Sequence, residues 1–210
     1  MLTLKAVRTI RESHVIAVPG TDWKESVAYK IVRQAMEDID RKEIIAIPMP
    51  MTKDPIVLED NHRQGANKIK EYLDQGKQVA FLTLGDVTVY STYLYLHKIV
   101  TDAGYDTEIV NGIPSFCAVA ARLNMGLVEK AESLHIIPAS YSTDEALKLP
   151  GTKVLMKSGK QIEKVKSQLK KLGSNAVMIE NCGMENEKIY RNVDEINENA
   201  GYYSLIIVKE

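Results

Sequence analysis

Cysteine is scarce in this chain of 210 residues, which has only Cys117 and Cys182. The two are far apart, and neither stands in a Cys-x-x-Cys pair or beside a histidine, so neither a zinc site nor a disulfide framework is indicated. No apolar run approaches the ~20 residues that a membrane-spanning helix needs, and no charged-then-apolar leader opens the sequence. We therefore expect a soluble, cytoplasmic protein without a bound metal.

An excess of one charge sign is also missing, because 27 basic and 28 acidic residues leave a formal charge of −1. This balance gives no general field that would attract nucleic acid or an anionic membrane, so we expect neither as a partner. The hydrophobic share of 45% is enough for a true core. The length allows one large domain or two of about a hundred residues each.

The common catalytic and phosphate-binding motifs are absent as well. The sequence has no G-x-x-x-x-G-K-S/T, G-x-G-x-x-G, G-x-S-x-G or H-E-x-x-H, which removes the best support for nucleotide, dinucleotide and zinc-protease functions. The four histidines are scattered: His14, His62, His97 and His135. His97 has the setting of a structural residue, whereas His62, in a polar segment, has either a structural role or a contact with substrate.

What the sequence does have is an alternation of strand and helix patterns. The predicted strands of the first half are 15–18, 43–47, 79–84 and 107–110, and the predicted helices are 2–10, 25–39, 61–74 and 92–103. The second half has strands at 134–138, 153–156, 176–179 and 203–208, with helices at 116–123 and 161–172. The alternation is typical of a mainly parallel sheet. We predict an α/β fold of two α/β domains, residues 1–112 and 113–210.

The junction at Gly85 and Asp86 is the most informative point of the chain. It follows the apolar run 79–84, and open α/β sheets hold their ligands at the carboxyl ends of such strands. Gly85 permits a tight turn, and Asp86 offers an acceptor for hydroxyl or ammonium groups. An aspartate that caps the following helix explains the same pattern equally well.

Basic side chains are frequent in the first half of the chain. They are Arg8, Arg11, Lys24, Lys30, Arg33, Lys53 and Arg63. A solvated face accounts for them by default, and a substrate with several carboxylates is the sharper hypothesis, because guanidinium groups bind carboxylates through two hydrogen bonds.

Four segments together resemble the tetrapyrrole methylase family, in both order and spacing. They are Gly85–Thr92, Ile109–Phe116, Leu155–Ser158 and Tyr203–Val208. Two further segments, Leu2–Ala6 and Pro48–Lys53, are most similar to the members that methylate carbon 20 of precorrin-2 or cobalt-factor II in corrin biosynthesis. The resemblance covers essentially the whole chain.

The resemblance implies two α/β domains with S-adenosylmethionine in the cleft between them, an acidic tetrapyrrole substrate and a homodimer. Carried over by position, the cofactor-binding residues are Gly85, Asp86, Val89, Pro114, Ser115, Lys157 and Met184, and the substrate-binding residues are Thr92 and Tyr95. It implies no protein-bound metal and no catalytic residue that can be named, with Asp86 and His62 as possible bases. The alternatives are methylation at another position or of another substrate, and a non-catalytic cofactor-binding scaffold.

Three departures from the family pattern stand out. The family's Gly-Asp-Pro reads Gly85-Asp86-Val87, and its Pro-Gly-Ile-Thr/Ser-Ser reads Asn111-Gly112-Ile113-Pro114-Ser115, which loses a hydroxyl. The family's first strand and its Gly-x-Gly-Pro-Gly loop would precede Leu2. We therefore expect a longer natural reading frame, and a natural start codon at Met1 with full activity would contradict this expectation.

Overall fold

The computed structural model describes residues 1–52, 54–140 and 143–209. The chain divides into two compact units, Met1–Pro114 and Ser115–Glu210. This division falls two residues beyond the boundary drawn from the sequence.

The first unit contains a parallel sheet in the order β2-β1-β3. Its strands are β1 (Val15–Pro19), β2 (Glu43–Ile47) and β3 (Val79–Phe81). Val15 lies opposite Glu43 on one side and Val79 on the other. All of β1 except its last residue is buried, as expected for a central strand with helices on both faces.

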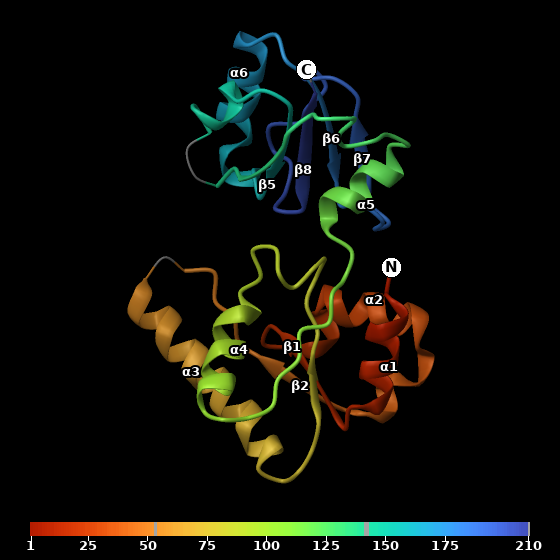
Figure 1. Ribbon diagram of the computed structural model, residues 1–210, viewed down its shortest axis with the longest axis vertical. Coiled ribbons are helices and arrows are strands. Elements are labelled where there is room, and N and C mark those ends of the chain that lie inside the picture. Colours follow the sequence, from red (N-terminus) through yellow and green to blue (C-terminus); the bar gives the residue numbers. More distant parts are fainter. Residues whose placement is uncertain (53, 141–142, 210) are drawn as a thin grey trace. The chain divides into compact units, whose positions relative to one another are not determined.

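Helices cover the two faces of this sheet (Figure 1). On one side lie α1 (Leu4–Glu12) and α2 (Val27–Ala35), and on the other α3 (Pro55–Leu73) and α4 (Tyr93–Asp102). Successive side chains of a strand point to opposite faces, so Ile16 and Val18 pack in the core under α1 and α2, while Val15 and Ala17 pack under α3 and α4. Two short 3₁₀ helices, η1 (Trp23–Glu25) and η2 (Glu37–Arg41), flank α2.

Several predicted elements of this unit are corrected by the structure. The helix predicted over 25–39 ends at Ala35, because Met36 has a non-helical backbone and η2 follows. The helix predicted from residue 61 begins at Pro55, where Asp54 caps it. The strand predicted over 79–84 has its ladder pairs only at residues 79–81.

The strand predicted over 107–110 is wrong. Residues 105–114 form neither helix nor strand, although the segment has the apolar, β-branched composition of a strand. A β-strand exists only with a neighbour that pairs its backbone, and within the described residues no strand pairs with this segment.

The second unit contains a mixed sheet in the order β4-β5-β8-β6-β7. The strands are β4 (Leu134–Pro138), β5 (Thr152–Met156), β6 (Asn175–Glu180), β7 (Lys188–Tyr190) and β8 (Ser204–Lys209). β4 and β5 are parallel, and the other pairs are antiparallel. The three-residue β7 is too short to show a periodicity and was not predicted.

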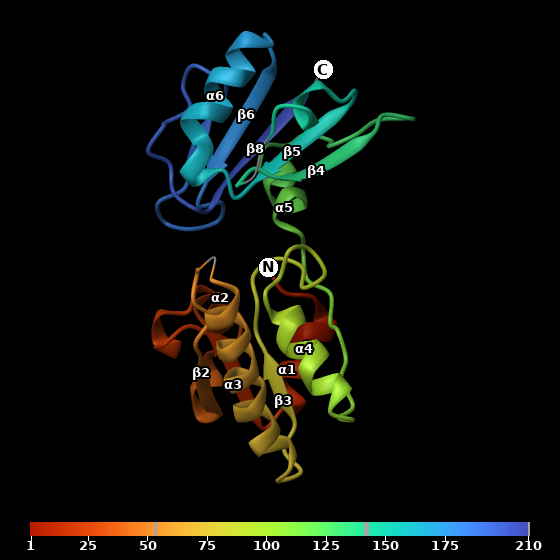
Figure 2. The ribbon, with the colours of Figure 1, turned by 90° about the vertical axis from the view of Figure 1, so that its left-hand side faces the viewer.

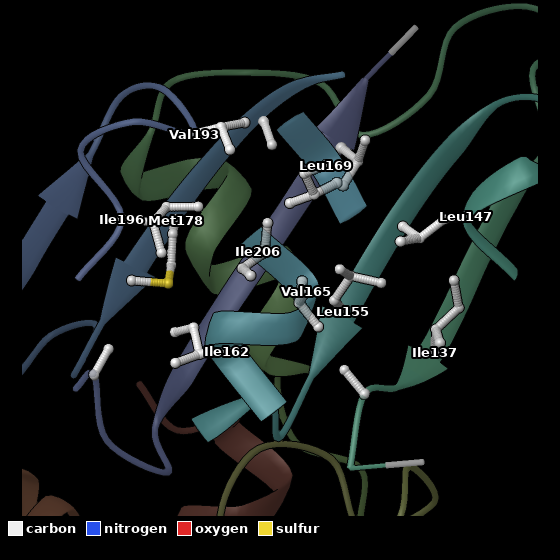
Figure 3. Close-up of a cluster of buried hydrophobic side chains, with 14 residues drawn as sticks. Ile137, Leu147, Leu155, Ile162, Val165, Leu169, Met178, Val193, Ile196 and Ile206 are labelled. Atoms are coloured by element: carbon white, nitrogen blue, oxygen red, sulfur yellow. The ribbon is translucent and has the colours of Figure 1, made fainter. Parts of the chain in front are cut away.

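In its described residues this unit has two α-helices, α5 (Ser115–Arg122) and α6 (Ile162–Lys171). Figure 2 shows α6 lying along β6 and β8. Val165 and Leu169 of α6 point toward the sheet, where Leu155 and Ile206 belong to the same buried cluster (Figure 3). The 3₁₀ helices η3 (Ala146–Lys148) and η4 (Gly159–Gln161) also belong to this unit.

Within residues 1–52, 54–140 and 143–209, no helix combines the length and the apolar character needed to cross a membrane. The same residues hold no group of three or more histidine, cysteine, aspartate or glutamate side chains placed to bind a metal ion.

Candidate functional site

The Gly85-Asp86 junction forms a tight turn that follows the end of β3. Gly85 has a φ of +69°, in the left-handed region that glycine adopts without strain. Asp86 is 7% exposed, and its Oδ1 accepts hydrogen bonds from the backbone N–H of Thr88 (2.8 Å) and from its hydroxyl (2.5 Å). The side chain therefore closes its own turn, and α4 begins only at Tyr93.

The second oxygen of Asp86 reaches a segment 26 residues further along the chain. Oδ2 accepts a hydrogen bond from the backbone N–H of Gly112 (3.0 Å) and a longer one from the Asn111 side chain (3.4 Å). These bonds, with that from the Thr88 hydroxyl as the main cause, lower the pKa of Asp86 although burial opposes the shift. Asp86 is thus an ionised clamp whose two oxygens are both occupied, a poor arrangement for a base.

Gly112 presses against the same turn. A Cβ atom added to Gly112 would lie 2.0 Å from the carbonyl oxygen of Gly85 and 3.1 Å from its carbonyl carbon. No other residue type fits there without moving the backbone. Neither Gly112 nor Asn111 was among the predicted site residues. The one signal in the sequence that pointed to Gly112 was that the family-like segments Gly85–Thr92 and Ile109–Phe116 each contain a glycine.

The other predicted residues of the first unit extend from this turn. The backbone N–H of Val89 donates to the carbonyl oxygen of Asp86 (3.2 Å), so Val89 belongs to the same turn. Thr92 is exposed just before α4, and Pro114 is partly buried at the end of the unit.

Tyr95, on α4, is 60% exposed, and its ring stacks on the imidazole of His62 from α3. The ring centroids are 4.8 Å apart and the planes differ by 8°. His62 is 8% exposed, and this burial lowers the pKa of its imidazole. The structure thus joins a predicted substrate residue to the one histidine for which the sequence left a functional role open, and burial favours the neutral form of that histidine.

The structure brings together only some of the basic residues of the first half: Lys24, Lys30 and Arg33 line one open cavity beside Trp23 and Tyr29. Arg8 and Arg11 are on α1, Lys24 is on η1, Lys30 and Arg33 are on α2, and Arg63 is on α3. Three of them form ion pairs, Lys30 with Glu25, Arg33 with Asp40 and Arg63 with Asp60. Lys53 lies outside the described residues. Outside the cavity, the arrangement is that of solvated helix surfaces.

In the second unit, the predicted residues lie at helix and strand ends. Ser115 begins α5. Lys157 follows β5 with a φ of +59°, a conformation that residues other than glycine rarely adopt and that is often found at functional sites. Met184 is partly buried in a turn after β6, where its N–H donates to the carbonyl oxygen of Asn181 (2.9 Å).

Ser158, next to Lys157, carries an unusual hydroxyl. The residue is fully buried, and its Oγ has no hydrogen-bond partner among the described residues. Buried hydroxyls are normally paired, so an orphaned one calls for a missing partner. Ser158 ends the family-like segment Leu155–Ser158 but is not among the predicted site residues, because burial and hydrogen bonding are not visible in a local pattern.

Two carboxylates fix the loops around these residues. Glu180 accepts the N–H of Gly201 (2.7 Å), whose carbonyl oxygen lies only 3.0 Å from the position of a Cβ on Gly159. Glu187 pairs with Arg122 of α5 (2.8 Å) and accepts the N–H of Gly183 (2.8 Å), next to Met184. The N–H of Gly183 is the main cause that lowers the pKa of Glu187. These loops present backbone groups held in fixed positions.

Comparisons with known proteins place the chain in a family. Residues 1–196 match the family model for tetrapyrrole (corrin/porphyrin) methylases. A probable cobalt-precorrin-2 C(20)-methyltransferase of Methanocaldococcus jannaschii is 35% identical over 100% of this chain and 90% of its own length. The cobalt-precorrin-2 C(20)-methyltransferase of Salmonella typhimurium is 29% identical over 100% of this chain and 91% of its own length.

Solved structures share the fold. A cobalt precorrin-4 methyltransferase has a TM-score of 0.73 at 16% identity, covering 99% of this chain and 88% of its own. A uroporphyrin-III C-methyltransferase from Thermus thermophilus, solved with S-adenosylhomocysteine, has a TM-score of 0.70 at 16% identity, covering 99% of this chain and 90% of its own. The chain belongs to the tetrapyrrole (corrin/porphyrin) methylase family and is a methyltransferase.

Proposed function

We propose that this methyltransferase transfers a methyl group from S-adenosylmethionine to carbon 20 of precorrin-2 or cobalt-factor II, a step of corrin biosynthesis. The observation that carries the proposal is the 35% identity to a probable cobalt-precorrin-2 C(20)-methyltransferase along the entire chain. A second relative with the same activity in its name also matches all of the chain.

The cofactor residues we propose are those carried over from the family: Gly85, Asp86, Val89, Pro114, Ser115, Lys157 and Met184. The bound cofactor supplies an activated methyl group. Asp86 contributes by fixing the backbone of the Gly85 turn, since its oxygens are occupied within the chain. The orphaned hydroxyl of Ser158 is sealed from solvent in this structure, so it bonds a polar ligand beside Lys157 only when the adjoining loop moves. Fixed backbone groups align reactants, which is the main demand of a methyl transfer.

The residues that we propose for the molecule receiving the methyl group lie on α3, on α4 or directly before α4. We assign substrate contacts to Thr92 and Tyr95, and the stacking of Tyr95 on His62 holds that ring in place. A ring carbon that gains a methyl group must lose a proton. We assign this role to His62, because burial favours its neutral imidazole, which can accept a proton, whereas both oxygens of Asp86 already accept hydrogen bonds within the chain.

The assembly and location we propose are a homodimer in the cytoplasm, both implied by the family resemblance. Sedimentation of the purified chain over a range of concentrations tests the first of these.

Mass spectrometry of the product tests the activity. Precorrin-2 and cobalt-factor II are offered side by side with the cofactor, and we expect one added methyl group, placed on carbon 20 by NMR. Methylation at another position would contradict the regiochemistry. Cofactor binding by calorimetry without any methylated product would instead identify a scaffold.

Replacing Ser158 by alanine tests the cofactor side. If the buried hydroxyl bonds the cofactor, Ser158→Ala weakens cofactor binding about tenfold, the equivalent of ~1.4 kcal/mol, and leaves stability unchanged or raised because an unpaired buried group is removed. Ser26→Ala is the matched control, since the Ser26 hydroxyl is equally buried and unpartnered in the described structure but lies before α2. Equal affinities of both variants and the parent chain would contradict the role of Ser158.

A further inference from the structure

An open cavity lies beside α2 in the first unit. Its volume is about 790 Å³, within the range of pockets that hold small organic molecules. Two aromatic rings, three basic side chains and one acid are part of its lining: Trp23, Lys24, Tyr29, Lys30, Arg33 and Asp40. These residues differ from all those proposed for the cofactor and the substrate, so the cavity is a separate candidate site.

The aromatic part of the lining is held in place by packing. Trp23 of η1 and Tyr29 of α2 meet edge to face, with ring centroids 4.9 Å apart and planes at 87°. Tyr29 is 4% exposed, and Trp23 packs against the same buried cluster. The Nζ of Lys24 lies over the Trp23 ring, 5.5 Å from its centroid. Because Lys24 is exposed, its ammonium group can turn aside and leave the Trp23 ring to stack on another flat ring.

Two of the lining cations already hold carboxylates. The Nζ of Lys30 pairs with Oε2 of Glu25 (2.8 Å). The Nε of Arg33 pairs with Oδ2 of Asp40 (3.2 Å), while Oδ1 of Asp40 accepts the Tyr29 hydroxyl. All four charged side chains are at least 40% exposed, and ion pairs this exposed contribute little to stability. A carboxylate from outside can therefore replace Glu25 or Asp40, and Asp40 keeps its bond to Tyr29 when Arg33 leaves it.

We propose that this cavity binds an aromatic polycarboxylate. Its ring stacks on Trp23, and its carboxylates take the places of Glu25 on Lys30 and of Asp40 on Arg33. The cations alone would accept any anion, and the rings alone would accept any flat apolar molecule, so the two together select a ligand with both features. Carboxylates are favoured over phosphates because the cations hold carboxylates in the structure, and because Asp40 remains in the lining and repels a more highly charged group.

The emission of Trp23 tests the proposal, since it is the only tryptophan of the chain and reports on this cavity directly. The full chain is titrated with benzene-1,3,5-tricarboxylate at neutral pH and low ionic strength. We expect a saturable change in emission, with half-saturation at about 1 mM or below. Cyclohexane-1,3,5-tricarboxylate has the same charges without the aromatic ring, and we expect it to bind at least about tenfold more weakly.

Two variants of equal charge separate these cations from a general attraction. Lys30→Gln combined with Arg33→Gln removes both carboxylate anchors and should weaken binding of the tricarboxylate at least about tenfold. Lys68→Gln combined with Lys98→Gln makes the same charge change on exposed side chains of α3 and α4, and binding should stay within about twofold of the parent chain. Thermal melting curves verify that both variants are folded.

Three results would overturn the proposal. The first is equal affinity for the aromatic and the saturated tricarboxylate, and the second is equal affinity of the two double variants. The third is tighter binding of ATP than of the aromatic tricarboxylate, which would assign the cavity to nucleotides. Methyl transfer enters none of these readouts. A chain that binds the tricarboxylate at Trp23 but methylates no tetrapyrrole would therefore refute the proposed function alone.

Discussion

Gly112→Ala is expected to lower the free energy of unfolding by about 3 kcal/mol, the upper range for forcing a methyl group into a packed site. The added Cβ would stand 2.0 Å from the carbonyl oxygen of Gly85, and backbone on both sides leaves no flexible side chain to move away. Separation of the two segments also breaks the bond from the Gly112 N–H to Asp86. Chemical denaturation of the parent chain and the variant measures the loss.

A glycine in open surroundings provides the control. The Cβ of Gly126→Ala would meet its nearest atom, the carbonyl oxygen of Val128, at 4.0 Å, which is an ordinary contact. We expect this variant to stay within about 0.5 kcal/mol of the parent chain. A Gly112→Ala protein as stable as Gly126→Ala would show that the two turns do not meet as described. The proposed cofactor residues Pro114 and Ser115 follow Gly112 closely. We therefore also expect the Gly112→Ala protein to bind the cofactor at least tenfold more weakly than the parent chain.

Asp86→Ala is the substitution with the second large effect. We expect it to lower the free energy of unfolding by about 2 kcal/mol or more. The change leaves the N–H groups of Thr88 and Gly112 without their acceptor in a partly buried place, and unmade hydrogen bonds to a charged group cost this much. Asp22→Ala is the matched control: Asp22 is exposed and accepts one N–H, from Lys24 (2.9 Å). We expect the free energy of unfolding of the Asp22→Ala variant to fall by about 1 kcal/mol or less.

The ionised form of Asp86 also gives stability a pH dependence. Its pKa is lowered in the folded chain, mainly by the hydroxyl of Thr88. The stabilisation is therefore complete above the unfolded-state pKa of about 3.9 and disappears as the pH falls through the lower folded-state pKa. Asp86→Asn should remove this part of the acid destabilisation. Denaturation curves recorded from neutral pH down to pH 3 check the difference, and parallel pH profiles for both proteins would contradict it.

The turn at Asp86 shows how far a local pattern reaches. A Gly-Asp pair after an apolar run indicates a turn, and the turn is there. The same pattern does not predict the contacts with Asn111 and Gly112. These residues donate the remaining hydrogen bonds to the Asp86 carboxylate, although they lie 25 and 26 residues further along the chain. Ser158 is a similar case, because an unpartnered hydroxyl becomes visible only when everything around it has been placed.

The α/β class and nearly every helix and strand follow from the amino-acid sequence alone, and the motifs match one enzyme family. Periodicity and β-branched runs record which faces are buried, and that information is local. Two features depend on the folded arrangement: Asp86 joins its own turn to Gly112 through hydrogen bonds, and residues 107–110 form no strand. Hydrogen bonds are made between segments distant in the chain, so an acceptor's role and a strand's existence depend on partners that no local pattern contains.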